Sequence, residues 1–123
     1  MLRFRKGTVR TFFSVFISIV LLASCEKYTF RPPEVDPEYP WSFRDDIQPV
    51  FTASCASCHG GSLAPDLRAG NSYNALTRGG YVSLPAEESK LYKKIISAGH
   101  SPRTTDAEKL KILYWITQGA KNN

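Results

Sequence analysis

The short stretch Cys55-Ala56-Ser57-Cys58-His59 brings two thiols and an imidazole together near the middle of the chain. Two residues separate the cysteines, so both thiols fit on one helical turn, and the histidine follows directly. Such a cluster serves three kinds of chemistry in proteins: covalent attachment of a c-type haem, thiol redox reactions, and zinc binding. The sequence around the cluster decides among them.

The flanking sequence favours haem over the other two chemistries. A thioredoxin-like pair of cysteines requires a strand before it and a helix after it, and the chain lacks this βαβ pattern. A structural zinc ion needs four ligands, and beyond residue 25 the chain offers only Cys55, Cys58, His59 and His100. For haem, each thiol adds to one vinyl group, and His59 reaches the iron from the same face. We therefore expect one covalent haem c, with the four-ligand zinc set as an alternative.

The N-terminal residues are typical of an export signal. Four basic residues lie among the first ten, and an apolar run at 12–23 follows them. This run is too short to cross a bilayer core, which needs about 20 residues, so a secretory signal fits better. It ends in Leu22-Ala23-Ser24-Cys25, which resembles the lipobox of bacterial lipoproteins, in which the cysteine accepts a diacylglycerol before cleavage. We expect residues 1–24 to be a lipoprotein signal peptide and Cys25 to be lipidated; the alternative is an ordinary signal with an unrelated cysteine.

The positive charge of the chain comes from that signal. The formal net charge is +5, from 16 Lys and Arg against 11 Asp and Glu. Without the four basic residues of the signal, 12 remain against 11, a net charge of +1. The mature chain therefore has no basic excess, and we expect it to bind no nucleic acid.

Residues 25–40 are predicted to be a tether that carries the folded part away from the lipid. Four of the eight prolines lie in this stretch, mixed with charged residues and without apolar periodicity. At about 3.1 Å per residue, an extended tether of this length spans up to roughly 45 Å. Residues 41–123 then form the domain, which is small enough to need a disulfide, metal or cofactor. Cys55 and Cys58 have no distant cysteine partner, so a disulfide framework is excluded.

The apolar spacing predicts an all-α domain. A first helix is expected from the N-cap Ser42 into the cysteine pattern, with an interruption near Pro49 and an end at the following glycines. Further helices are expected over 72–78 and 86–97. The last helix begins at a capping box, Thr105-Asp106-Ala107-Glu108, and runs toward Gly119. A short extended piece is expected over 79–84.

Residues 41–123 resemble a monohaem class I cytochrome c domain, a small helical domain wrapped around one covalent haem. The resemblance implies that the first and last helices cross, with Val50 and Phe51 meeting Trp115 and Gly119. It also implies that the carbonyl of a proline after the cysteine pattern accepts a hydrogen bond from the proximal histidine. The segment Ala64-Pro65-Asp66-Leu67 matches that part of the family. Pro65 then orients His59 and Leu67 belongs to the haem wall; the alternative for Pro65 is an ordinary turn proline.

The chain departs from the family at the sixth iron ligand, which is usually a methionine. The only methionine is Met1, which leaves with the signal peptide. By elimination, His100 is expected to be the second metal ligand beside His59, since it lies in a loop five residues before the helix cap Thr105. An open sixth position and a lysine ligand such as Lys90 or Lys93 are the alternatives, and a lysine must lose its proton to bind.

The resemblance implies electron transfer, with redox proteins docking at the exposed haem edge of a monomer. No catalytic triad, catalytic carboxylate pair or phosphate loop points to an enzyme. A haem-based ligand sensor or a peroxidase-like site with an open sixth position is the alternative function, and a structural zinc lipoprotein is a third. The lipidated Cys25 implies membrane attachment in a bacterial cell envelope. Because Glu26 replaces the aspartate that commonly retains lipoproteins at the inner membrane, we expect the outer membrane.

The lipid anchor is tested by Cys25→Ser. We expect the wild-type protein to partition into detergent, and the variant to be unprocessed or soluble, because the variant lacks the thiol that accepts the lipid. Cell fractionation and the intact mass of the N-terminal fragment measure this. Normal cleavage together with unchanged membrane association of the variant contradicts the lipobox interpretation.

Overall fold

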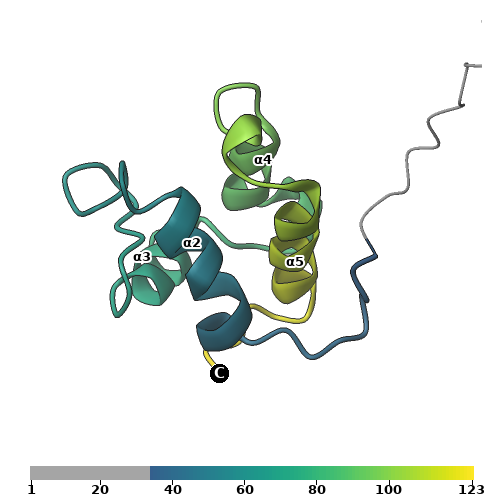
Figure 1. Ribbon diagram of the computed structural model, residues 1–123. Helices are drawn as coiled ribbons and strands as arrows, with labels where there is room; N and C mark the ends of the chain where they lie inside the picture. Colours follow the sequence, from purple (N-terminus) through teal and green to yellow (C-terminus); the bar gives the residue numbers. More distant parts are fainter. Residues whose placement is uncertain (1–33) are drawn as a thin grey trace, which may run out of the picture. The chain divides into compact units, whose positions relative to one another are not determined.

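The computed structural model describes residues 34–123, which belong to one compact unit. The predicted signal peptide, Cys25 and the first part of the tether lie outside the described residues. In the described part the chain is helical and contains no strand, which confirms the all-α prediction (Figure 1). None of its described helices has the length and apolar character needed to cross a membrane.

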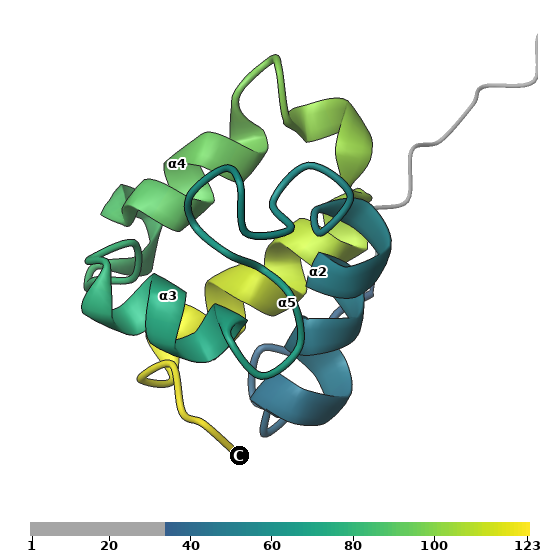
Figure 2. The same cartoon turned by 90° about the vertical axis from the view of Figure 1, so that its left-hand side faces the viewer.

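The described residues form six short helical segments, followed by a longer C-terminal helix. In order they are η1 (Phe43–Ile47), α2 (Gln48–Ser54), α3 (Ser72–Arg78), η2 (Ala86–Glu88), α4 (Lys90–Ile96), η3 (Ser101–Arg103) and α5 (Asp106–Thr117). In Figure 2 a long loop, residues 59–71, lies between α2 and α4, and α5 lies behind it. This loop follows the cysteine pattern directly.

The first predicted helix is present as two joined segments. Ser42 caps it by accepting a hydrogen bond from the backbone N–H of Asp45 at 3.2 Å. The first turn is wide, because the N–H of Ile47 bonds to the carbonyl of Ser42, five residues earlier. Pro49 lies in the first turn of α2. It has no N–H to donate, and its ring opposes a tight continuous helix across this point. The wide turn of η1 is therefore the interruption that the sequence predicts near Pro49.

The helix predicted over 86–97 is divided by Ser89. The Ser89 side chain donates to the carbonyl of Ala86 at 2.7 Å and accepts from the N–H of Tyr92 at 3.2 Å. A buried serine that bonds to backbone on both sides ends one short helix and caps the next, so the prediction of one continuous helix is wrong. The helix over 72–78 is confirmed, and residues 79–84 form no strand.

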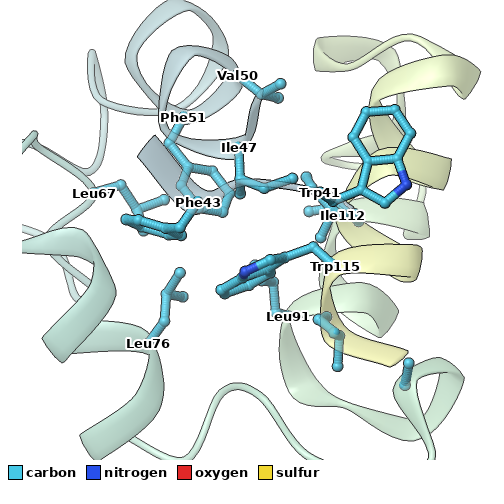
Figure 3. Packing of buried hydrophobic residues seen from close by; sticks show 13 residues of the cluster. Trp41, Phe43, Ile47, Val50, Phe51, Leu67, Leu76, Leu91, Ile112 and Trp115 are labelled. Atoms are coloured by element: carbon cyan, nitrogen blue, oxygen red, sulfur yellow. The ribbon is translucent and has the colours of Figure 1, made fainter. Parts of the chain in front are cut away.

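The core is centred on the aromatic ring of Phe43 (Figure 3). Its ring centre lies 5.2 Å from that of Trp115 on α5, 5.1 Å from Tyr73 on α3, and 6.3 Å from Phe51 on α2. Phe43 therefore joins three helices through ring contacts, each of which stabilises the fold beyond simple burial. Ile47, Phe51 and Trp115 have no exposed surface.

The predicted contact of the last helix through Gly119 is not made. Gly119 is exposed, and a side chain placed on it would meet nothing within 4 Å. Its φ of +96° instead ends α5, since a glycine adopts this backbone without strain. The first and last helices meet through the rings of Phe43 and Trp115, and Val50 and Phe51 belong to the same buried cluster as Trp115. Only the predicted contact at Gly119 is wrong.

Residues 36–41, of which 36–40 were predicted to be tether, are held against the end of α5. The amide of Gln118 donates to the carbonyls of Pro37 at 2.9 Å and Tyr39 at 2.8 Å, and its oxygen accepts from the N–H of Trp41 at 3.2 Å. Trp41 also donates through its indole to the carbonyl of Asp36 at 3.2 Å. The folded part therefore begins several residues before residue 41.

The capping box of α5 supports a stability test. Thr105 accepts from the N–H of Glu108 at 3.2 Å, and the Glu108 carboxylate accepts from the N–H of Thr105 at 2.7 Å. Thr105→Ala is expected to lower the free energy of unfolding by about 1 kcal/mol, measured by denaturant titration. Thr117→Ala is the control, since that hydroxyl only bonds back to Leu113 within the helix. Equal losses in the two variants contradict the capping role.

Candidate functional site

One cavity of about 410 Å³ opens beside the cysteine pattern, large enough for a cofactor. Most of its lining is apolar, with Phe51, Leu67, Leu91 and Ile95 among the side chains that line it. The walls come from the end of α2, the loop 59–71, the start and end of α4, and the turn before α5. The cavity thus draws on α2, α4, η3 and the loops beside them.

Both cysteines and His59 lie in the wall of this cavity. The pattern forms one further turn after α2, in which the N–H groups of Cys58 and His59 bond to the carbonyl of Cys55 at 3.1 and 2.9 Å. Cys55 is half-buried and Cys58 is exposed, and both are free thiols. The tight turn brings the two thiols and the imidazole to one side, as the sequence predicts.

The surroundings of Cys55 do not favour a thiolate. Burial raises the pKa of its thiol, and the negative charge of Glu108 raises that pKa further. Cys55 also follows the C-terminal end of α2, whereas redox-active thiols are stabilised as thiolates at helix N-termini. Burial and Glu108 outweigh the opposing positive charge of Arg103, so the local structure does not activate Cys55 as a thioredoxin-like cysteine.

The His59 ring is oriented by the carbonyl of Pro65. The distance from Nδ1 of His59 to this oxygen is 3.2 Å, the contact that the family resemblance implies. Because a carbonyl oxygen can only accept, the contact places the proton on Nδ1 and leaves the lone pair of Nε2 free. A free Nε2 lone pair is what a metal ligand must offer.

The loop that carries Pro65 is held by a group of side-chain bonds. The carboxylate of Asp66 accepts from the guanidinium of Arg68 at 3.0 and 2.7 Å and from the amide of Asn71 at 2.8 Å. These bonds, those from Arg68 first, hold the pKa of Asp66 well below its usual range. Gln48 of α2 donates to the carbonyl of Leu67 at 3.2 Å, so the loop is also tied to the first helix.

His100 faces His59 across the cavity. The centres of the two rings are 6.4 Å apart, and both residues line the same space. Burial lowers the pKa of His100, and the positive charge of Lys94 lowers it further, which favours the neutral imidazole that binds metals.

The donor set fits a haem better than a bare metal ion. Within residues 34–123, no three His, Cys, Asp or Glu side chains converge closely enough to hold a metal ion, so the zinc set is not assembled. A haem iron receives four nitrogens from its porphyrin and needs only two from the protein. Thr104 adds a further sign of a bound group, because its buried hydroxyl lacks a partner in this part of the chain and lies in the cavity wall.

The cavity wall also contains residues that sequence reasoning did not single out. Besides Thr104, these include Lys94 and Arg103. Of the two lysines considered as iron ligands, Lys90 lines the cavity, whereas Lys93 is paired with Glu88 and lies outside the wall. The helical spacing of four residues between Lys90 and Lys94 is the signal that could have identified Lys94.

Comparison of the chain with protein-family models, curated proteins and solved structures finds no match. The identity of the site therefore depends on its own residues and geometry.

The hydrogen bonds that Asp66 accepts from Arg68 and Asn71 predict that the stability of the domain depends on pH. The folded-state pKa of Asp66 is lowered, so its contribution to the free energy of unfolding is complete above the unfolded pKa near 3.8 and is lost as the pH falls toward the folded value. We expect Asp66→Asn to be less stable than the wild type at neutral pH, and the difference to close below pH 3.8. Denaturant titrations at several pH values measure this, with Glu87→Gln on the exposed surface as control. If the difference in stability between the wild type and Asp66→Asn does not change with pH, the ionised Asp66 does not hold the loop.

Proposed function

We propose that this domain carries one haem c, bound through thioethers to Cys55 and Cys58 and ligated by His59 and His100, and that it transfers electrons. The observation that carries the proposal is the pair of imidazoles 6.4 Å apart across an apolar cavity whose wall includes both thiols. Covalent attachment and two axial ligands use all four of these side chains. Thiol redox chemistry leaves the two imidazoles unexplained, and a bare zinc ion leaves the apolar cavity of about 410 Å³ unexplained.

Each residue has a separate task in this proposal. A bound haem supplies an iron that gains and releases one electron without breaking bonds. Pro65 fixes the tautomer of His59, so that Nε2 is presented to the cavity. Phe51, Leu67, Leu91 and Ile95 exclude water from most of the cavity, which affects the reduction potential.

Electron transfer is favoured over ligand sensing because His100 lies near His59 in the wall of the same cavity, where it would supply a second ligand to a bound iron. A six-coordinate iron has no open position for a small molecule or a peroxide. Cys58 is exposed, so an attached haem edge reaches solvent there, where a redox protein could dock. We propose that the protein works as a monomer in the bacterial cell envelope, attached to the outer membrane through Cys25.

His100→Ala tests this ligation. Wild-type protein matured with haem is expected to be low-spin in the ferric state, to lack the absorption band of a thioether ligand, and to bind CO slowly or not at all. His100→Ala is expected to become high-spin and to bind CO at once, because one axial position is opened. Visible and EPR spectra with CO titration measure both.

Lys90→Ala is the matched variant for the lysine alternative, since Lys90 also lines the cavity. We expect it to stay low-spin. A wild type that is already high-spin and binds CO immediately contradicts ligation by His100 and favours the sensor or peroxidase function. A low-spin His100→Ala with a high-spin Lys90→Ala assigns the ligand to the lysine.

A further inference from the structure

The charged side chains in the cavity wall are all basic. They are Lys90, Lys94 and Arg103, and none of the Asp or Glu residues described by the structure lines the cavity. The ion pairs of the described residues involve Arg68, Lys93 and Lys109, so the three basic residues of the cavity are not neutralised by a carboxylate of this part of the chain. An apolar cavity with an uncompensated basic rim fits an occupant that is apolar in its body and anionic at its edge.

Two of these charges are placed as a pair. Lys90 and Lys94 are four residues apart on α4, so they lie on the same face of the helix, one turn from each other. Lys93, between them in sequence, points elsewhere and pairs with Glu88. Both lysines of this helix face therefore line the cavity.

The pair lies away from the cysteines. In Figure 2, α4 and α2 lie on opposite sides of the loop 59–71, which passes in front, and both helices contribute to the cavity wall. The first residues of α4 are joined to Tyr81, since the N–H of Leu91 donates to the Tyr81 carbonyl at 2.8 Å. Arg103, by contrast, lies near the cysteines, because its charge acts on the Cys55 thiol.

The chemistry of the porphyrin fixes which edge faces α4. The vinyl groups that form thioethers occupy one half of the ring, and the two propionate carboxylates occupy the other half. Attachment at Cys55 and Cys58 therefore directs the carboxylates toward the far side of the cavity. A protonated lysine offers three donors and a compact charge to a carboxylate there.

We infer that Lys90 and Lys94 bind the two propionate carboxylates of the haem and so set its orientation, an inference that rests on the proposed haem site. The lysines must keep their protons to do this, so neither is an iron ligand. Their charges favour the ionised propionates and lower the pKa of those carboxylates. Tyr81 and Arg103 are the other charged or titratable groups of the wall besides the cysteines and histidines.

The test uses full-length protein matured with haem, as wild type, as Lys90→Gln/Lys94→Gln, and as the control Lys93→Gln/Lys121→Gln. The control removes two positive charges from residues outside the cavity wall. The reduction potential is measured against pH, and the step that marks propionate ionisation is located. We expect this step to move up by about one pH unit in the cavity variant and to stay in place in the control.

The propionate bending band in the resonance Raman spectrum is the second readout, since it responds to hydrogen bonding of the carboxylates at fixed pH. A shift of this band in the cavity variant alone supports the inference. An unchanged step and band, or equal changes in the control, overturn it. Failure of the wild type to incorporate haem overturns the proposed function itself, and this is seen in the same sample before any lysine is compared.

Discussion

The contact between Nδ1 of His59 and the carbonyl oxygen of Pro65 is the interaction on which the site depends. It fixes the tautomer of the imidazole and so leaves the lone pair of Nε2 free on a residue that lines the cavity. The loop around Pro65 is held by Asp66, Arg68 and Gln48, so the position of one carbonyl oxygen is determined by bonds to two different parts of the fold. Without that position, His59 and His100 have no reason to face each other.

The same loop explains how so small a domain arranges a large cavity. The helices of the domain pack around the ring contact of Phe43 with Trp115. Phe51, Leu67 and Leu91 line the cavity. Apolar walls of this extent gain about 25 cal/mol per Å² when an apolar group covers them. The proposed porphyrin, held by two thioethers, would cover them permanently and would become part of the core of the domain.

Local patterns predicted the features that depend on neighbouring residues. The capping box at Thr105, the helix over 72–78 and the turn of the cysteine pattern follow from side chains within a few positions, and the structure contains them. The break at Ser89 was missed because its side chain competes with the helix for backbone bonds. The bonds of Gln118 to residues 37–41 join segments far apart in sequence, and no periodicity indicates them. The spacing of Lys90 and Lys94 places them on one face of α4, but only the fold shows that this face lines the cavity.

Covalent attachment of one haem is the central claim, and it is measured most directly by intact mass after denaturation. The full chain is expressed with a haem-maturation system, extracted with acid and acetone, and compared with the double variant Cys55→Ser/Cys58→Ser. The account predicts that wild-type protein retains the mass of one haem through extraction, and that the double variant Cys55→Ser/Cys58→Ser retains none. Wild-type protein that loses all of its haem under these conditions, or never acquires it, contradicts the account.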